Sequence, residues 1–453
     1  MMQSLGIGVS GLSAAQRGIE VVSHNIANVN TPGYSRQRVE LSAAFPTVGT
    51  RALGPGAYGT GVEITGVRQL RDTLLDNAAR GALSNQGSKE EIERAMSSIQ
   101  HIAGSLDDGL STDLSRLWSA LSDVVANPQG ITARSTALDA ATRLAATLRS
   151  ASASIEHLAS DSATRLGGYV SQVNGLATQV ASLNASILNV TSAGGTPNDF
   201  VDQRNVALEQ LAKLTGGEVR ESMGSVDVTV GGAIVVSGVR SYAMTASGVP
   251  PVIMVDGGAV TAGGSIGALT DLATHGLDQL RQRLDLVANG LRDAMNTAHA
   301  GGTDLDGHPA IAFFTGTGAA NLAVNNNLGP RQLAASTSGK PADGNNAQAM
   351  ADVRYGKIIA TLASPGAPSL TASDAMADIV SELGQRAASA QRELDASNAT
   401  VSSLDSQRQE TSGVSIDEEM TELLKYQRAY EAAARIITAS DQMLDTLINR
   451  VGR

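Results

Sequence analysis

Residues 413–450 read GVSIDEEMTELLKYQRAYEAAARIITASDQMLDTLINR, and this stretch decides the fold of the chain. Apolar or small residues recur in it at seven-residue intervals, in two rows. The first row is Ile416, Leu423, Tyr430, Ile437, Leu444 and Val451, and the second is Tyr426, Ala433, Ser440 and Leu447. Two such rows form one face of an α-helix. Ser415 and Glu418 match a capping box, so we expect the helix to begin there.

A matching pattern occupies the other end of the chain. The first row is Leu5, Leu12, Ile19 and Ile26, and the second is Gly8, Ala15, Val22 and Val29. An ordinary amphipathic helix explains either pattern alone, but a matched pair at both termini favours pairing with each other or with neighbouring subunits. Four glycines at positions 6, 8, 11 and 18 weaken the first helix by about 1 kcal/mol each relative to Ala. We therefore expect both ends to be mobile in the monomer.

Between the ends, helical and extended patterns alternate. A turn at residues 30–33, Asn-Thr-Pro-Gly, precedes an irregular linker or hairpin over 34–66. Apolar periodicity predicts helices over 68–104, 112–126, 132–191 and 199–214, with a capping box at Ser88 and Glu91. Segment 132–191 keeps one heptad register and would span roughly 90 Å. Valine-rich runs with glycine pairs predict strands within 216–265; helical periodicity returns at 269–291 and again after a polar stretch at 300–345.

These patterns predict a mainly α fold with a small β insertion in mid-chain. We expect an elongated molecule whose N- and C-terminal parts form long antiparallel or coaxial helical rods. Residues 1–33 and 413–453 would form a terminal coiled-coil layer. Residues 34–215 and 267–412 would form a helical rod domain with an extended linker, and residues 216–266 a β-rich inserted domain.

The composition of the 453 residues excludes several kinds of site. The chain has no Cys, which removes disulfides, thiolate metal sites and thiol nucleophiles. Its formal net charge of −11, without a basic block, argues against nucleic-acid binding, which depends on neutralising phosphates. With one Trp, seven Tyr and four Phe, few bulky side chains are available for burial. Long thin helical packing is therefore favoured over a thick core.

Neither a membrane span nor a cleavable signal is expected. No segment reaches the roughly 18 uninterrupted apolar residues of a transmembrane helix. The first twenty residues lack the positive start and continuous apolar stretch of a signal peptide. The chain should stay in the cytoplasm or leave by a route that reads no ordinary signal.

Short motifs that resemble binding sites lack the context that such sites need. Residues 6–11, GIGVSG, match G-x-G-x-x-G, but only five residues precede them, so no strand can lead in. Residues 304–307, DLDG, resemble part of a calcium loop. Gly302 stands where the first ligand belongs and no Glu closes the loop, so a plain turn is favoured. None of the six His falls in H-E-x-x-H. We expect no catalytic residue, metal or cofactor, and a structural role rather than an enzyme.

Residues 23–37, SHNIANVNTPGYSRQ, carry a resemblance to a known family. The core ANVNTPGY resembles the N-terminal signature of the bacterial flagellar axial proteins; the signature residues are Asn28, Asn30, Pro32, Gly33 and Tyr34. The continuation YSRQ (34–37) is similar to the family of hook-associated protein 1 (FlgK), the hook–filament junction proteins, rather than to the hook protein. Three other stretches agree with it: DQR at 202–204, TDLDG at 303–307 followed by FF at 313–314, and the C-terminal helix.

The resemblance implies a structural axial protein of the bacterial flagellum, located outside the cell after type III export without a cleaved signal. Its termini would fold into a coaxial helical pair on joining the growing structure. The implied partners are copies of the chain, the hook protein, the second hook–filament junction protein and an export chaperone on the C-terminal helix. By resemblance, Leu423, Tyr430, Ile437 and Leu444 form the face that chaperone and assembled partner share.

Assembly through the terminal helices assigns an interface to the heptad rows. The expected interface residues are Leu5, Leu12, Ile19, Val22, Ile26, Val29, Ile416, Leu423, Tyr426, Tyr430, Ile437, Leu444 and Leu447. Three alternatives stay open: the hook protein or another axial protein, a secreted enzyme carried in the β insertion, and a secreted helical binding module. The enzyme is disfavoured because segment 216–265 contains no His.

Overall fold

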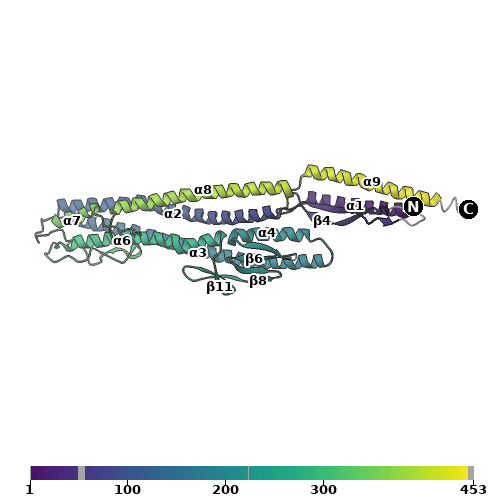
Figure 1. The fold of residues 1–453 in the computed structure, drawn as a ribbon. Helices are drawn as coiled ribbons and strands as arrows, with labels where there is room; N and C mark the ends of the chain where they lie inside the picture. The colour runs from purple at the N-terminus through teal and green to yellow at the C-terminus, as the bar shows by residue number, and fades with distance from the viewer. Residues whose placement is uncertain (1, 49–56, 223, 365, 447–453) are drawn as a thin grey trace. The chain divides into compact units, whose positions relative to one another are not determined.

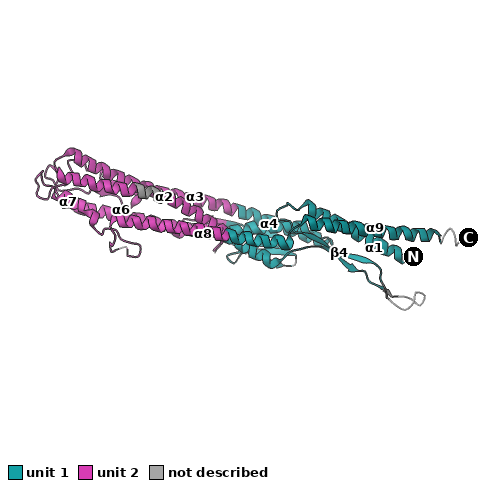
Figure 2. Cartoon of the chain, turned by 90° about the horizontal axis from the view of Figure 1, so that it is seen from above, with its two compact units in different colours: residues 1–85, 172–244, 398–453 teal, residues 86–171, 245–397 magenta. Residues whose placement is uncertain are grey.

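The computed structural model describes residues 2–48, 57–222, 224–364 and 366–446 (Figure 1). Residue contacts divide the chain into two compact units, which Figure 2 shows in different colours. Unit 1 comprises residues 1–85, 172–244 and 398–453, and unit 2 comprises residues 86–171 and 245–397. Each unit therefore combines segments that are far apart in the sequence. The three-part division expected from the sequence has different boundaries and stays a prediction.

The fold is mainly α-helical, with most of its strands between α4 and α5, which confirms the expected class. The helices of more than ten residues are α1 (Met2–Ala27), α2 (Thr73–Ala126), α3 (Ile131–Ser192), α4 (Asn198–Thr215), α6 (Leu277–Ala300), α8 (Ala372–Ser412) and α9 (Ile416–Thr446). The shorter helical segments are α5 (Gly264–Asp271), the π-helix η1 (Leu272–Gly276), η2 (Ala319–Asn321), α7 (Asn345–Asp352) and η3 (Val353–Tyr355).

The strands form small antiparallel sheets. In unit 1, β1 (Gln37–Ala43) pairs with β4 (Val62–Gln69), and β2 (Thr47–Val48) pairs with β3 (Ala57–Tyr58). A four-stranded sheet follows the order β5 (Glu218–Ser222), β6 (Ser225–Val230), β7 (Ala233–Ser237) and β8 (Arg240–Ser241). A three-stranded sheet, in unit 2 except for Met244, has the order β11 (Gly258–Val260), β10 (Val252–Val255) and β9 (Met244–Ser247). In unit 2, β12 (Phe314–Thr315) pairs with β13 (Ala323–Val324).

Unit 2 contains one large hydrophobic cluster. Buried Leu, Ile and Ala side chains of α2, α3, α6 and α8 form one continuous cluster, represented by Leu121, Leu148, Leu284 and Ile379. These side chains recur at helical spacing, so each helix presents one apolar face to the others. The periodicity read from the sequence is sufficient to predict this core.

The polar stretch after α6 is held by buried hydrogen bonds in unit 2. His299 is fully buried: its Nδ1 lies 2.8 Å from the carbonyl oxygen of Ile311, and its Nε2 accepts the N–H of Ala334 at 2.8 Å. Because Nε2 accepts, the proton is on Nδ1 and the ring is neutral. Burial lowers the pKa of His299 accordingly. The guanidinium of Arg134, 1% exposed, donates to the carbonyl of Leu333 in the same stretch.

In unit 1, α1 lies between two partners. It packs against α9 on one side and against the β1–β4 pair on the other, where Val21, Val39 and Val67 form a small cluster. The four-stranded sheet is tied to α3 by Asn184, which is fully buried and donates to the carbonyls of Val226 and Gly238. The sequence predicted a linker or hairpin over 34–66 but not its contact with α1.

Two expectations about element boundaries are wrong. Residues 68–104 and 112–126 were expected to form separate helices, but from Thr73 onwards they belong to the single helix α2, and residues 68–69 belong to β4. Ser88 and Glu91 therefore lie inside a helix and form no capping box. The helix instead begins after Asp72, whose Oδ1 accepts the N–H groups of Leu74 and Leu75 at 2.9 and 3.2 Å.

Among the described residues, no helix is long and apolar enough to cross a membrane.

Candidate functional site

The terminal helices α1 and α9 lie side by side in unit 1 and run in opposite directions (Figure 1). Their close approach depends on glycine. A Cβ placed on Gly18 would lie 2.5 Å from the ring of Tyr426, and one on Gly8 would lie 3.0 Å from Cγ1 of Ile437. Because no side chain occupies these positions on α1, α9 can pack directly on the α1 backbone. These glycines weaken α1 in isolation but let it pair.

The structure places the predicted interface residues at different depths within this pair. On α1, Val22 is buried, whereas the other five are partly buried: Leu5, Leu12, Ile19, Ile26 and Val29. On α9, four are partly buried: Leu423, Tyr426, Ile437 and Leu444. Ile416 and Tyr430 remain exposed, at 52% and 39%. Leu447 lies outside the described residues. The two helices thus cover only part of the predicted rows.

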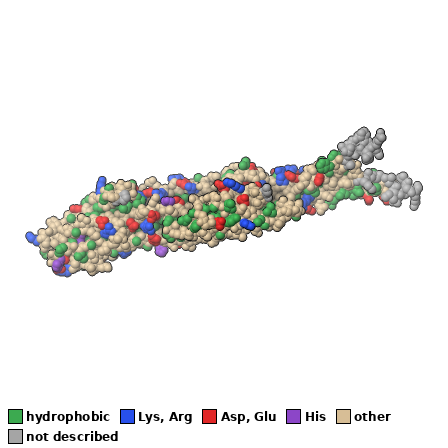
Figure 3. Space-filling model, turned by 60° about the horizontal axis from the view of Figure 1, so that its bottom comes forward, with side chains coloured by type: hydrophobic (Ala, Val, Ile, Leu, Met, Phe, Trp, Pro, Cys, Tyr) green, Lys and Arg blue, Asp and Glu red, His purple; other side chains and the backbone are tan. Residues whose placement is uncertain are grey.

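Helix α9 also exposes apolar side chains that the predicted rows do not contain. Met420, Leu424, Ile436 and Met443 are between 45% and 53% exposed. Figure 3, which brings the bottom of the Figure 1 view forward, shows hydrophobic side chains on the surface near the end of unit 1 where the chain termini lie. The sequence suggested a single apolar seam on this helix. By helical spacing the four exposed side chains flank that seam, Met420 and Leu424 on one side and Ile436 and Met443 on the other.

The signature residues form a tight turn after α1. The N–H of Tyr34 donates to the carbonyl of Thr31 at 3.2 Å around Pro32 and Gly33. Gly33 has φ +76°, as the second central residue of a type II turn requires, which confirms the expected turn. A Cβ on Gly33 would also lie 2.3 Å from Cγ2 of Val206 in α4. Glycine is needed here both for the backbone angle and for the contact with α4.

Asn28 and Asn30, two further signature residues, both follow the end of α1 at Ala27. Asn28 is partly buried; its Nδ2 donates to the carbonyl of His24 at 3.0 Å, and its Oδ1 accepts from Thr31 Oγ1 at 3.1 Å. Asn30 and Pro32 are exposed. Asn28 therefore ends the helix and starts the turn.

A buried set of polar side chains joins this turn to both terminal helices. We call it the polar clasp, and it consists of Asn25, Tyr34, Arg36, Gln37 and Glu419. Asn25 Nδ2 donates to Glu419 Oε2 and to the carbonyl of Gln37, both at 2.9 Å. Asn25 Oδ1 accepts from the Tyr34 hydroxyl at 2.8 Å and from the N–H of Gln37 at 3.0 Å. Arg36 Nε donates to Glu419 Oε1 at 2.7 Å.

The clasp is electrostatically strained on its α4 side. Asp202 Oδ2 accepts the N–H of Ser35 at 3.1 Å, and Oδ1 lies 3.6 Å from the Arg71 guanidinium. Both contacts lower the pKa of Asp202, but burial outweighs them and raises it to about 6. Burial, with the charges of Asp199, Asp202 and Glu419, also raises the pKa of Tyr34 above its usual value. The Tyr34 hydroxyl therefore keeps the proton that it donates to Asn25.

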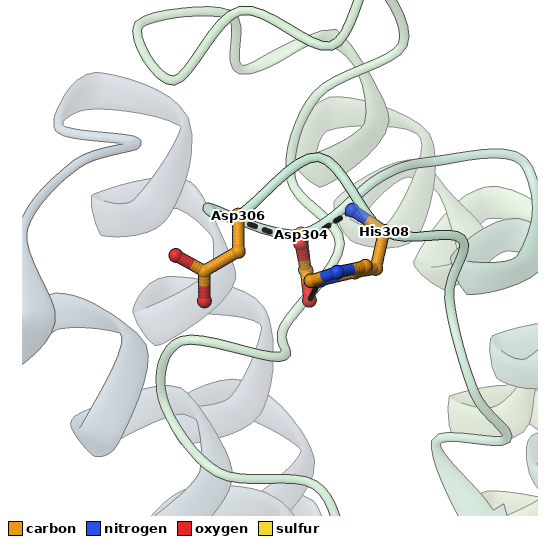
Figure 4. A group of neighbouring side chains, drawn as sticks. All are labelled: Asp304, Asp306 and His308. Carbon is orange, nitrogen blue, oxygen red and sulfur yellow. Dashed lines mark hydrogen bonds and ion pairs between the residues drawn. The ribbon is translucent and has the colours of Figure 1, made fainter.

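The loop at 304–307 has the hydrogen bonds of a turn. Asp304, Asp306 and His308 lie together (Figure 4). Asp304 Oδ1 accepts the N–H groups of Asp306 and His308 at 2.8 Å each, and Gly307 has φ +83°. Asp306 forms an ion pair with Arg331. An aspartate that bonds the backbone two and four residues on stabilises a turn, so we assign this loop a structural role.

Sequence reasoning found the turn but missed the clasp. Asn25 and Glu419 belong to none of the apolar rows, and they are 394 positions apart. The only available signal was chemical: an Asn and a Glu at the edges of heptad patterns, each a candidate for a buried register-setting contact. The side chains of the polar clasp form hydrogen bonds with one another, so the clasp can hold the helices in position.

Comparison with known proteins agrees with this geometry. The model of the flagellar hook-associated protein FlgK helical domain matches residues 96–314. The flagella basal body rod protein model matches residues 5–34, and the C-terminal model of the flagellar basal body rod FlgEFG proteins matches residues 405–450. Together the three models match more than half of the chain and include both terminal helices.

Relatives align over nearly the whole length. The chain is 28% identical to flagellar hook-associated protein 1 of Bacillus subtilis, with 97% of this chain and 96% of the relative covered. It is 26% identical to flagellar hook-associated protein 1 of Salmonella typhimurium, with 97% and 98% covered.

A solved structure shares the fold. It is the flagellar hook junction protein FlgK from Burkholderia pseudomallei, with a TM-score of 0.64, 17% identity, and coverage of 75% of this chain and 100% of that chain. With the helical-domain model in the middle, rod-protein models at both ends and full-length relatives, the chain belongs to the FlgK family of flagellar hook-associated proteins.

Proposed function

We infer that this chain is a structural subunit of the bacterial flagellum at the junction between hook and filament. The observation that carries this role is the alignment with hook-associated protein 1 relatives over 97% of the chain. The described site agrees with it, because its hydrogen bonds and apolar contacts hold helices in place. A structural role requires no catalysis, and we propose none.

We propose that the subunit assembles through α1 and α9. The support comes from α9, whose apolar side chains Met420, Leu424, Ile436 and Met443 are roughly half exposed in the single chain. Burying such side chains against another subunit is favourable by about 25 cal/mol for each Å² removed from water. The interface would combine this surface with the heptad rows from Leu5 to Val29 and from Ile416 to Leu447. In this proposal the terminal helices form one layer, separate from the rod and from the β-rich segment.

The proposed partners are the other axial components of the flagellum. Copies of the chain would contact one another laterally, with the hook protein on one side and the second hook–filament junction protein on the other. An export chaperone would cover the C-terminal helix before assembly, and export would proceed without a cleaved signal to a final place outside the cell. The similarity of both termini to flagellar rod proteins supports association with axial components.

The test combines deletion of the gene with complementation. Deletion should leave hooks without filaments and release flagellin monomers into the medium, and the wild-type gene should restore filaments. Leu424→Asp should fail to restore them, because it places a charge on the proposed interface. Gln442→Asp, at an exposed polar position on the side of α9 away from the heptad rows, should restore them. Filaments of normal length in the deletion strain would overturn the junction role. Full complementation by Leu424→Asp would contradict only the proposed role of α9 in assembly and would leave the junction role standing.

A further inference from the structure

On α1, the row of residues that touches α9 is neither of the two apolar rows, whereas on α9 it is the second predicted row continued by seven residues to Glu419. On α1 the row is Ser4, Gly11, Gly18 and Asn25, and opposite them on α9 lie Ser440, Ala433, Tyr426 and Glu419. Each step of seven residues along α1 corresponds to a step of seven backwards along α9. The contact row therefore contains small residues along most of its length and a buried polar pair at one end.

Apolar and small residues do not by themselves select this register. If α9 slid by one heptad, Gly11 would face Tyr426 and Ser4 would face Ala433. Gly11 has no side chain, so it could accept the Tyr426 ring as Gly18 does. The heptad rows on either side would still bring apolar residues together, because both repeat every seven positions. The spacing of the apolar rows alone therefore does not specify which heptad of α9 meets which heptad of α1.

The buried carboxylate of Glu419 distinguishes them. Glu419 is 1% exposed, and its two oxygens accept from Asn25 Nδ2 and Arg36 Nε. In the register slid by one heptad, Glu419 would lie opposite Gly18, which offers no donor side chain. A charge buried without partners is strongly unfavourable, more so than any gain from a single pair.

The donors to Glu419 are themselves fixed by the signature turn. The N–H of Arg36 donates to the carbonyl of Ser412 at 2.9 Å, and the carbonyl of Arg36 accepts the N–H of Leu70 at 2.8 Å. The Asn25 amide is held in one orientation by the Tyr34 hydroxyl and the N–H of Gln37. Asn25 lies on α1 and the carbonyl of Arg36 is bonded to Leu70, so neither donor is carried along with α9 if it slides.

We propose that the polar clasp sets the register in which α9 pairs with α1. Glu419 is the positioning residue, because its carboxylate accepts hydrogen bonds from the two donors that the signature turn holds in place. The turn then serves the terminal helices, because it holds two donors at a place where only one heptad alignment of α9 brings a carboxylate. The turn and α9 then become ordered together. The inference concerns pairing within one chain and does not depend on the proposed junction role.

Cysteine cross-linking in the full chain tests the register directly, because the natural sequence has no Cys. Ser4→Cys with Ser440→Cys reports the observed register, since the two hydroxyl oxygens lie 3.5 Å apart. Ser4→Cys with Ala433→Cys reports the register slid by one heptad. In the otherwise unchanged chain, the first pair should form a disulfide under mild oxidation and the second should form little.

Glu419→Gln is then added to each pair. A glutamine has one oxygen, so either Asn25 or Arg36 would face its amide N–H groups instead of an acceptor. Leaving one buried donor unsatisfied should raise the ratio of slid to observed cross-link roughly tenfold or more. The matched control is Glu418→Gln, which also removes a charge beside Arg36 but at a side chain that is 64% exposed. It should leave the ratio unchanged.

Two outcomes would overturn the proposal. An unchanged ratio in Glu419→Gln would show that packing alone sets the register. Loss of both cross-links would show that Glu419 holds the helices together without choosing between alignments.

Discussion

The core of unit 2 and the α1–α9 pair of unit 1 are both helical packings, but they are built differently. In unit 2, fully buried Leu and Phe side chains from α2, α3, α6 and the following loop fill one cluster. Between α1 and α9, the contact row contains Gly, Ala and Ser, and the most buried large side chain is the charged Glu419. The first packing depends on apolar burial within the chain. The second is thin and leaves apolar side chains of α9 exposed.

The difference shows how one chain can combine a part that is stable by itself with a part that is stabilised by contacts with neighbouring subunits. Burial of a Leu side chain contributes about 1.5–3 kcal/mol, whereas a contact between Gly and Ala removes little apolar surface from water. The α1–α9 pair should therefore be marginal in the single chain and gain stability when neighbours cover α9. The earlier expectation that both termini are mobile in the monomer follows the same reasoning and stays a prediction.

The largest expected effect contrasts one leucine from each region. Leu148→Ala removes a fully buried side chain from unit 2 and should destabilise the isolated chain by about 2–5 kcal/mol. Leu424→Ala, at a residue that is 53% exposed on α9, should change it by less than about 0.5 kcal/mol. Thermal unfolding of the isolated chain measures both. Equal losses would mean that α9 is as fully packed in solution as unit 2, which would break the comparison.

A smaller effect separates two glycines of α1. Gly18→Ala places a methyl group 2.5 Å from the Tyr426 ring, so it should weaken the α1–α9 pair by about 1–2 kcal/mol. Gly6→Ala meets nothing within 4 Å and should gain up to about 1 kcal/mol from helix propensity. Amide exchange of α1 in the isolated chain measures both. Equal stabilisation by the two substitutions would show that the close approach of the helices is absent in solution.

The smallest and most gradual effect is a pH response of opposite sign in the two units. Asp202 in unit 1 has a pKa raised to about 6, so its contribution to stability is present at acidic pH and is lost as the pH rises through 6. His299 in unit 2 has a lowered pKa, so its contribution is present above the ordinary value of 6.5 and is lost as the pH falls. Acidification from pH 7 to 5 should therefore favour unit 1 locally and disfavour unit 2.

Local amide exchange, corrected for its intrinsic pH dependence, measures this response around each group. Asp202→Asn should flatten the pH profile near the signature turn, and His299→Asn should flatten it near residues 301–344. Each substitution serves as the control for the other, because the groups belong to different units. Profiles that keep their slopes in these variants would assign the pH response to other groups.

The sequence predicted most helices and strands because periodicity reports burial directly. Segment 132–191 corresponds to α3, and 199–214 to α4, within one residue at each end. The split of α2 into two helices was wrong because the sequence around residues 104–111 contains glycines, and tertiary packing on both sides overrides that local preference. The capping box at Ser88 failed for the same reason: a local motif does not show whether the helix already continues.

The sequence by itself determined the helical class, the place of the strands, the two terminal heptad patterns and the glycine turn at residues 30–33. Each of these depends on neighbours along the chain, through spacing or a backbone angle. Only the tertiary structure decided which row of α1 meets α9, and that Asn25, Arg36 and Glu419 bury one another. A heptad repeat looks the same after a shift of seven residues, so the repeat by itself does not specify the register of the two helices. The register depends on a contact between residues 394 positions apart, which only the folded chain brings together.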